Sequence, residues 1–399
     1  MLPGGPWPSF YPSVRLLDRY LLRNFLLPFT YCVLGFLSIW LVYELGGNAN
    51  NFIANGVSLR NVFAFYGGQL PAIALLILPM ALLLALLYCL GRMSQSNELL
   101  SMLGAGVSLG RVLLPVYGAG LLVTALSTFV SYAPAPQADA QRGLAEAQMQ
   151  GDTGKLEKKS ATLGYLFRNR ADDRLWYIER MPADETKPME GVQVVQQDHR
   201  NDIVEKLYAK TAVFEPGAHR WTFTDTRVVH FNTAGDVTAE SYPPRQEVNN
   251  WSETPWRIAS ALLDADKLSV PELHQYLRLN ADFTQSQLAP FRTYLAYRWS
   301  LPWRCMVVVL LAAPLGIVYQ RRSVIAGVAT AILMFLFILF FDSLFVAVGK
   351  GDRLAPLLAA CVTNGVFAVV GLALLRQKAL NMDSLPTNWV TLRQFVTGR

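Results

Sequence analysis

A run of residues without charge constrains the fold of this chain more than any other feature. Residues 70–90, LPAIALLILPMALLLALLYCL, contain no Asp, Glu, Lys or Arg. About 20 consecutive apolar residues cross the hydrocarbon core of a bilayer as a helix, and a helix inside a soluble domain rarely needs that length. The composition agrees, because 16% of the residues are charged, compared with about 25% in a typical soluble domain. The sequence therefore predicts a membrane protein.

Other segments of the chain are also apolar enough to be transmembrane helices. They predict a membrane α-helical fold of six spans, in which the first span directs insertion because no signal-peptide pattern precedes it. All four cysteines fall within the spans, so no disulfide framework is expected. The predicted spans are residues 25–45, 70–90, 112–133, 299–319, 324–349 and 354–375.

The distribution of Lys and Arg between the short loops predicts the orientation. Cytoplasmic loops carry an excess of these residues, which places both termini and the loop at residues 92–111 in the cytoplasm. The long polar segment after the third span is then outside the cytoplasmic membrane. The opposite short loops hold only Arg60, Lys350 and Arg353. The bases on the predicted cytoplasmic side are Arg15, Arg19, Arg23, Arg92, Arg111, Arg321, Arg322, Arg376, Lys378, Arg393 and Arg399.

The polar segment between the third and fourth spans has the pattern of short strands. Residues 161–170, 174–181 and 220–232 alternate apolar and polar side chains and are rich in aromatic and β-branched residues. That pattern predicts an inserted all-β domain, a sandwich or jelly roll. Ser269 and Glu272 predict a capping box on a helix that leads back to the membrane. The predicted domains are residues 1–133 with a short helix at about 94–104, the jelly-roll-like domain with flanking helices at 134–290, and residues 291–399 with a cytoplasmic tail.

No catalytic or metal-binding motif stands out. GDTGK (Gly151–Lys155) lacks the spacing of a phosphate loop, and Leu156 stands where Ser or Thr is required. The net charge of +6 reflects the loop bias, and no basic stripe with interleaved aromatic residues predicts nucleic-acid binding. A protein without enzymatic activity or cofactor is expected. The histidines, none near a cysteine or in a zinc-binding motif, are His199, His219, His230 and His274.

The loop RMSQSNELLSMLGAGVSLGR (Arg92–Arg111) predicts a short helix between two spans. Ser94 or Ser96 is expected to cap it, and Gly104 and Gly106 are expected to end it. Its apolar side could dock in a groove of a soluble partner, or it could rest on lipid headgroups. The residues expected to carry such a contact are Ser96, Asn97, Glu98, Leu99, Met102 and Leu103.

Several segments, in order along the chain, resemble the lipopolysaccharide-export permeases of the LptF/LptG type. Leu16–Tyr20 (LLDRY) and Tyr177–Arg180 (YIER) are more similar to the LptG branch of the family. The layout of three spans, an inserted outer domain and three more spans is also similar. The resembling segments are SNELLSMLGAGVSLGRVLLP (96–115), LLDRYLLRNFLLPF (16–29), LWYIER (175–180), LSVPELHQYL (268–277) and LAAPLGIVYQRRSVIAG (311–327).

The resemblance implies the permease subunit of an ABC-type extractor in the bacterial inner membrane. Such a subunit moves lipopolysaccharide from the outer leaflet to a periplasmic bridge, and residues 134–290 would be periplasmic. The implied partners are a cytoplasmic ATPase dimer (LptB type), which binds the ATP, a second permease subunit (LptF type), a single-span bridge protein (LptC type) and a soluble bridge protein (LptA type). Residues 94–108 would contact the ATPase, with Glu98 as the main polar contact.

One departure from the family concerns recognition of lipid phosphates. Relatives of this type carry lysines near the outer end of the first span, but WLVYELGGNANN (Trp40–Asn51) contains no base. The phosphates could instead be bound by Arg60, by Lys350 and Arg353, or by the partner subunit. The lipid could also be less phosphorylated.

Two charged residues inside predicted spans need a partner or water. Arg304 in the fourth span and Asp342 in the fifth are both expected at the depth of the outer leaflet. A lone charge inside a bilayer costs about 2.5–3.5 kcal/mol on insertion scales. The two residues could form a structural ion pair, or they could face the lipid cavity or its gate.

Alternative functions are a permease for another lipid or for lipoproteins, and a membrane-anchored scaffold or sensor that binds a ligand. Lipoprotein-release permeases place their large outer domain after the first span, and here it follows the third. A sensor would need cytoplasmic modules larger than these short loops. A secondary transporter would favour inverted repeats and broken helices around charges at mid-membrane.

Overall fold

The computed structural model divides the chain into two compact units. The helical unit draws on residues 1–47, 70–135 and 293–399, and the β unit on 48–69 and 136–292. The sequence placed the domain boundaries at 133/134 and 290/291, and it did not anticipate that residues 48–69 belong with the β unit. The described residues are 11–54, 58–136, 138, 161–182, 187–260, 264–317 and 324–379. Gly151–Lys155, Arg321, Arg322, Arg393 and Arg399 lie outside them.

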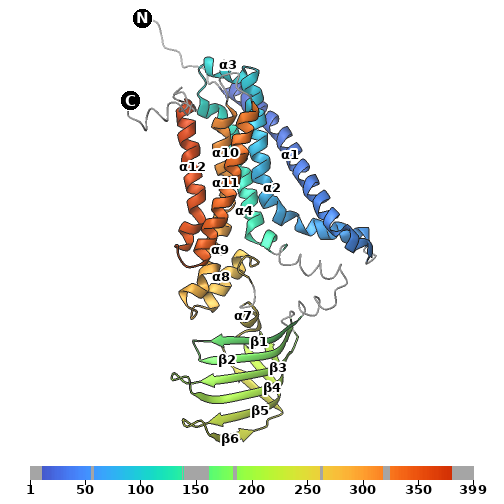
Figure 1. The fold of residues 1–399 in the computed structure, drawn as a ribbon, viewed down its shortest axis with the longest axis vertical. Coiled ribbons are helices and arrows are strands. Elements are labelled where there is room, and N and C mark those ends of the chain that lie inside the picture. Colours follow the sequence, from blue (N-terminus) through green and yellow to red (C-terminus); the bar gives the residue numbers. More distant parts are fainter. Residues whose placement is uncertain are drawn as a thin grey trace, which may run out of the picture. The chain divides into compact units, whose positions relative to one another are not determined.

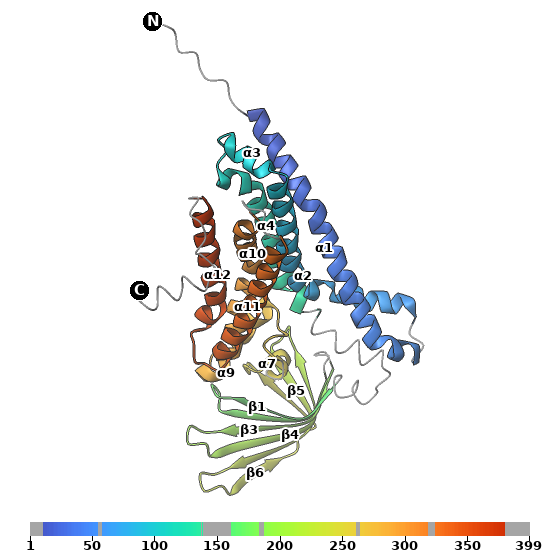
Figure 2. The same ribbon diagram turned by 45° about the horizontal axis from the view of Figure 1, so that its top comes forward.

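The predicted helical membrane fold is confirmed. Within the described residues, five helices are long and apolar enough to span a membrane, and a bent pair makes a sixth if it counts as one span. In the helical unit α10, α11 and α12 lie side by side, and α1 runs along the edge (Figure 1, Figure 2). The helices concerned are α1 (Tyr11–Ala54), α2 (Leu59–Gln95), α4 (Leu109–Tyr132), the bent pair α9 (Gln285–Ser300) and α10 (Trp303–Gly316), α11 (Val324–Lys350) and α12 (Pro356–Ala379).

The fourth predicted span is not one straight helix. It breaks at Leu301 and Pro302, and α9 and α10 meet there at an angle of 49°. Proline has no N–H to donate, and it disfavours the helical conformation of the residue before it. The sequence predicted a span at 299–319, and the structure has this bent pair of helices there, with Arg304 in the first turn of α10.

The core of the helical unit lies between α2, α4 and α10. Leu82, Leu86 and Leu113 are fully buried there. A Cβ added at Gly120 on α4 would lie 2.8 Å from a methyl carbon of Val309 on α10, so the two helices approach as closely as small residues permit. By contrast, 6% of the most apolar window of α1 is buried, against 56% for α2. Most of α1 therefore presents apolar side chains outward.

The described residues of the β unit form one antiparallel sheet of seven strands, which confirms the inserted β domain. Each strand from β1 to β6 pairs with the next, and β7 pairs with the same edge of β5 as β6 does. The described pairings are those of a meander, without the crossovers between two sheets of a jelly roll. The strands are β1 (Ala161–Asn169), β2 (Arg174–Pro182), β3 (Met189–Gln197), β4 (Ile203–Glu215), β5 (Arg220–Phe231), β6 (Val237–Ser241) and β7 (Arg245–Asn249).

Strand alternation places an aromatic core on one face of the sheet. Trp176 and Ile178 on β2 are buried, and Tyr177 between them is exposed. Trp221 lies 5.0 Å from Trp176 between ring centroids. Its indole N–H donates to the carbonyl of Glu253 at 2.8 Å, which satisfies the polar group of a buried ring.

Buried charges join the sheet to the helices that follow it, α7 (Pro255–Ser260) and α8 (Val270–Leu279). Arg174 pairs with the fully buried Glu253 at 2.7 Å, and Arg257 pairs with Asp282 at 2.8 Å. Burial opposes ionisation of Asp172, but hydrogen bonds from Ser252 and Asn169 and the nearby arginine charges outweigh it and lower the pKa of its carboxyl.

The predicted capping box on α8 is present. The backbone N–H of Ser269 donates to the carboxylate of Glu272 at 2.7 Å, which satisfies a donor that the helix itself cannot use. Tyr276 on α8 stacks on Phe291 with ring centroids 3.8 Å apart. Burial raises the pKa of the Tyr276 hydroxyl to about 12.

Candidate functional site

The predicted short helix is present as α3 (Glu98–Gly104). Its N-cap is Asn97, in the left-handed conformation with φ of 57°, so the prediction of Ser94 or Ser96 as the cap was wrong. Ser96 instead donates from its hydroxyl to the Glu98 carboxylate at 2.9 Å and from its backbone N–H to the carbonyl of Arg92 at 3.0 Å. The physical reason is that α2 continues to Gln95, which leaves only Ser96 and Asn97 between the two helices. Asn97 precedes α3 in the left-handed conformation, which asparagine tolerates better than serine.

The C-terminal end of α3 is set by Gly106, as the sequence predicts. Gly106 has φ of 86°, its N–H donates to the carbonyl of Leu103, and the N–H of Val107 donates to the carbonyl of Met102. These two bonds define a Schellman motif, which glycine favours because it has no Cβ. The helix is therefore held at both ends by local backbone geometry.

The apolar side of α3 packs on its own helical unit. Leu99 is 1% exposed and belongs to the core cluster of that unit, and Met102 and Leu103 pack partly buried against the cluster. Leu99 therefore anchors the helix to its own unit, whereas Met102 and Leu103 on the same side stay partly exposed. From residue 94 to residue 108, the exposed residues are Gln95, Ser96, Asn97, Ser101, Gly104, Ala105, Gly106 and Ser108.

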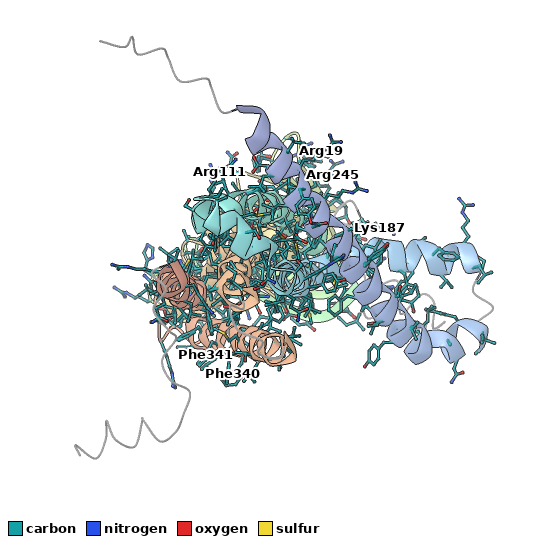
Figure 3. All side chains as sticks on the ribbon, turned by 90° about the horizontal axis from the view of Figure 1, so that it is seen from above. Arg19, Arg111, Lys187, Arg245, Phe340 and Phe341 are labelled. Carbon is teal, nitrogen blue, oxygen red and sulfur yellow. The ribbon has the colours of Figure 1, made fainter. Side chains whose placement is uncertain are left out.

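Polar contacts tie α3 and α4 to the start of α1. Tyr20 on α1 donates from its hydroxyl to the Glu98 carboxylate at 2.8 Å. Arg111 on α4 pairs with Asp18 on α1 at 2.9 Å; Figure 3 views the unit from this end and labels Arg111. Glu98 thus already accepts two hydrogen bonds within the chain. Sequence reasoning missed Tyr20 and Asp18 as contacts, although both lie in the LLDRY segment.

Arg304 and Asp342 are brought together as a buried ion pair between α10 and α11. Their side chains are 6% and 7% exposed. Arg304 also donates to the hydroxyl of Tyr297 at 3.2 Å. A paired, hydrogen-bonded charge is the form in which ionisable groups persist at membrane depth. Tyr297 is a third member that the sequence pattern did not indicate.

The other predicted lipid-site bases are exposed. Lys350 ends α11 and donates to the hydroxyl of Tyr294 at 3.1 Å, with its ammonium 5.0 Å from the centre of that ring. Arg353 follows in the turn after α11. Arg60 is exposed in the first turn of α2, in the part of that helix that belongs to the β unit. In the described parts of the chain, no group of three or more His, Cys, Asp or Glu could hold a metal ion.

Comparison with known proteins gives a family match over nearly the whole chain. The family described as "Lipopolysaccharide export system permease LptF/LptG" matches residues 19–377. The lipopolysaccharide export system permease protein LptG of Escherichia coli strain K12 is 23% identical over 309 residues, which are 75% of this chain and 81% of the relative. LptG of Escherichia coli O6:H1 strain CFT073 matches with the same identity and coverage.

Proposed function

Because the chain belongs to the LptF/LptG family of lipopolysaccharide export permeases, we propose that it is the permease subunit of an ABC-type extractor. In this proposal it moves lipopolysaccharide from the outer leaflet of the inner membrane to a periplasmic bridge. A separate cytoplasmic ATPase dimer of the LptB type hydrolyses the ATP. The single observation that carries the proposal is α3, a short helix with a polar exposed edge and an apolar side fixed in the helical core.

The ATPase contact is assigned to the exposed edge of α3. Ser96, Asn97 and Ser101 are exposed polar residues on or beside this helix, whereas Leu99 is buried beneath it. A rigid-body displacement of α3 would therefore act on the helical core through Leu99, Met102 and Leu103, because a close-packed interior transmits strain. In this proposal Leu99, Met102 and Leu103 transmit the displacement of α3 to the helical core. The exposed polar residues of α3 make the contact with the ATPase.

The polar contacts to α1 give that displacement a direction. Movement of α3 pulls on Tyr20 through Glu98, and movement of the α4 start pulls on Asp18 through Arg111. A partly exposed ion pair contributes about 0–1 kcal/mol, and a single hydrogen bond about 0.5–1.5 kcal/mol. They are therefore weak enough to break and re-form in a transport cycle, while the packing of Leu99 holds the helix in place.

A second permease subunit of the LptF type is proposed against the outer sides of α1 and α11. Buried fractions of their apolar windows are 6% and 22%, and Phe340 on α11, 61% exposed, is labelled at the edge of the unit in Figure 3. Such faces meet lipid or other helices in a bilayer. The β unit would meet the bridge proteins of the LptC and LptA types in the periplasm, with both chain termini in the cytoplasm.

Lipid phosphates would be met by exposed bases at the predicted outer side. Lys350 and Arg353 lie within one turn of each other at the end of α11, and Arg60 begins α2. Arg304 and Asp342 are assigned to the gate, because they hold α11 to α10. A partner helix would have to displace or accommodate this pair to open the unit beside α11.

The experiment compares one exposed site on α3 with a matched site elsewhere. Full-length protein carrying Ser101→Arg, and a control carrying Ser58→Arg, are affinity-purified from native membranes. Both serines are exposed, but Ser58 lies before α2, on the predicted outer side. The proposal expects the wild type and Ser58→Arg to retain a co-purified ATPase and bound lipopolysaccharide, and Ser101→Arg to lose the ATPase. Equal ATPase recovery from both variants would contradict it.

The lipid content of the same preparations tests the alternative that the permease transports another lipid or a lipoprotein. Lipopolysaccharide enriched over bulk membrane lipid supports an extractor of this lipid. Enrichment of another lipid or of a lipoprotein instead would favour a permease for that cargo.

A further inference from the structure

A groove of about 600 Å³ lies between α1 and α2 in the helical unit, beside α3. It belongs neither to the exposed edge of α3 nor to the ion pair of Arg304. The residues lining this α1–α2 groove are Tyr20, Arg23, Asn24, Leu27, Pro28, Tyr31, Cys32, Leu84, Tyr88, Cys89, Arg92, Met93, Glu98 and Val328.

The lining residues recur at helical spacing, so each helix contributes one continuous side. On α1 the groove follows the chain from Tyr20 to Cys32, about 18 Å of helix at 1.5 Å per residue. On α2 it follows Leu84 to Met93. The site is therefore an elongated channel parallel to the helices.

Chemical character changes along the groove. The end beside α3 carries the charged residues, Arg23, Arg92 and Glu98. The other end carries apolar and aromatic residues such as Leu27 and Leu84. A charged end at the membrane boundary and an apolar end at membrane depth match the two parts of a lipid molecule.

The charged end of the groove has a net positive charge, and its two arginine side chains have no bonded partner in the described residues. Within the described residues, the side chains of Arg23 and Arg92 are exposed and make no hydrogen bond or ion pair. Glu98 accepts hydrogen bonds from Tyr20 and Ser96. This end of the groove therefore holds two guanidinium groups without a bonded partner and one carboxylate that already accepts two hydrogen bonds.

We propose that the α1–α2 groove binds an anionic phospholipid of the leaflet next to α3. Its phosphate lies between Arg23 and Arg92, because guanidinium groups bind phosphate oxygens through paired charge-assisted hydrogen bonds. One acyl chain follows Leu27, Pro28 and Leu84 into the membrane. A free phosphate would leave the apolar part of the groove empty, so the lipid is the occupant that the whole lining fits.

This lipid is distinct from the exported one. The cargo of the proposed extractor enters from the outer leaflet, whereas the groove opens at the end that carries α3 and the basic residues. Since Tyr20 and Glu98 line the groove, the bound headgroup lies beside the contact that joins α1 to α3. It would therefore stabilise α1 against the rest of the unit, where few protein side chains do so.

The test is native mass spectrometry of the full-length protein in detergent with equimolar phosphatidylglycerol and phosphatidylcholine. The wild type is expected to retain phosphatidylglycerol in preference. Arg23→Gln with Arg92→Gln should lower its occupancy about tenfold or more, because hydrogen bonds to charged groups are lost. Arg23→Lys with Arg92→Lys should keep part of the preference.

The matched control removes the same charge from exposed arginines outside the lining, by Arg19→Gln with Arg376→Gln, and should leave occupancy unchanged. Equal loss in the control, or no preference for phosphatidylglycerol in the wild type, would overturn the proposal. So would competition by inorganic phosphate at the same concentration as the lipid. If the double glutamine variant does not fold, the wild-type preference and the phosphate competition decide alone.

Discussion

The hydroxyl of Tyr20 on α1 donates a hydrogen bond of 2.8 Å to the carboxylate of Glu98 on α3. It joins residues far apart in the sequence, from the most exposed apolar helix and from the helix proposed to meet the ATPase. The bond makes α1 part of the structure that would respond when α3 moves.

Tyr20→Phe should weaken coupling without removing the ATPase. The change deletes one hydrogen bond worth about 0.5–1.5 kcal/mol and keeps the aromatic ring. We expect ATP hydrolysis to persist and the lipopolysaccharide released per ATP hydrolysed to fall in reconstituted proteoliposomes. Tyr43→Phe, at an exposed tyrosine farther along α1, is the control. An unchanged ratio in Tyr20→Phe would show that the contact has no part in coupling.

Leu99→Ala should destabilise the protein, unlike changes on the exposed edge of α3. Leu99 is 1% exposed, and removing a buried leucine costs about 2–5 kcal/mol. Thermal unfolding in detergent should occur at a clearly lower temperature for Leu99→Ala. For Ser101→Ala it should stay close to wild type. A stable Leu99→Ala protein would mean that α3 is not anchored as described.

The pair of Arg304 and Asp342 allows stability to be separated from export. Asp342→Asn leaves a buried guanidinium without its counter-charge, which costs about 3–5 kcal/mol in proteins. The double variant Arg304→Met with Asp342→Leu should recover most of that loss, because both buried charges are gone. Measurement of export in the stable double variant decides between the alternatives: full export indicates a purely structural pair, and lost export supports a role at the gate.

Close packing at Gly120 should reverse the usual effect of glycine replacement in a helix. Alanine normally stabilises a helix interior by about 1 kcal/mol relative to glycine. Here the added Cβ would lie 2.8 Å from Val309, so Gly120→Ala should lower the unfolding temperature. Adding Val309→Ala should restore it. If Gly120→Ala alone is stabilising, α4 and α10 do not approach this closely.

Asp172 should make the β unit more stable above its pKa than below it. The folded-state pKa of Asp172 is lowered, so the folded state holds its proton less strongly than the unfolded chain does. This contribution is fully present above the unfolded pKa, about 3.9, and is lost as pH falls through the folded pKa. Tryptophan fluorescence of acid unfolding should show a weaker pH dependence in Asp172→Asn. An unchanged unfolding profile would show that Asp172 does not contribute to the pH dependence of the stability of the β unit.

Much of the helical architecture could be predicted because the bilayer fixes the length of an apolar span. The helix over residues 70–90 followed from that constraint alone. The bend between α9 and α10 at Pro302 was not predicted, because proline is common inside transmembrane helices. The sequence does not show which of these prolines interrupts a helix. Gly106 could be predicted as the end of α3, because the end of this helix depends only on the local backbone conformation that glycine favours.

The site was harder to predict because its contacts are not local. The spacing of Leu99, Met102 and Leu103 showed that they share an apolar side of α3. It did not show that this side packs on the hydrophobic core of the chain's own helical unit. The contact of Tyr20 with Glu98 depends on the packing of α1 against α3, which no periodicity encodes. The left-handed turn at Asn97 depends on where α2 ends, and Ser94 and Ser96, which are as good N-cap residues as asparagine, gave a misleading prediction of the cap.

A photocrosslinking amino acid at position 101 reports whether the exposed edge of α3 touches an ATPase in cells. We expect a covalent adduct between position 101 and a nucleotide-hydrolysing protein, identified by mass spectrometry, and no such adduct from position 58. An adduct with that ATPase from position 58, or its absence from position 101 when the protein is folded in the membrane, would show that α3 does not make the ATPase contact.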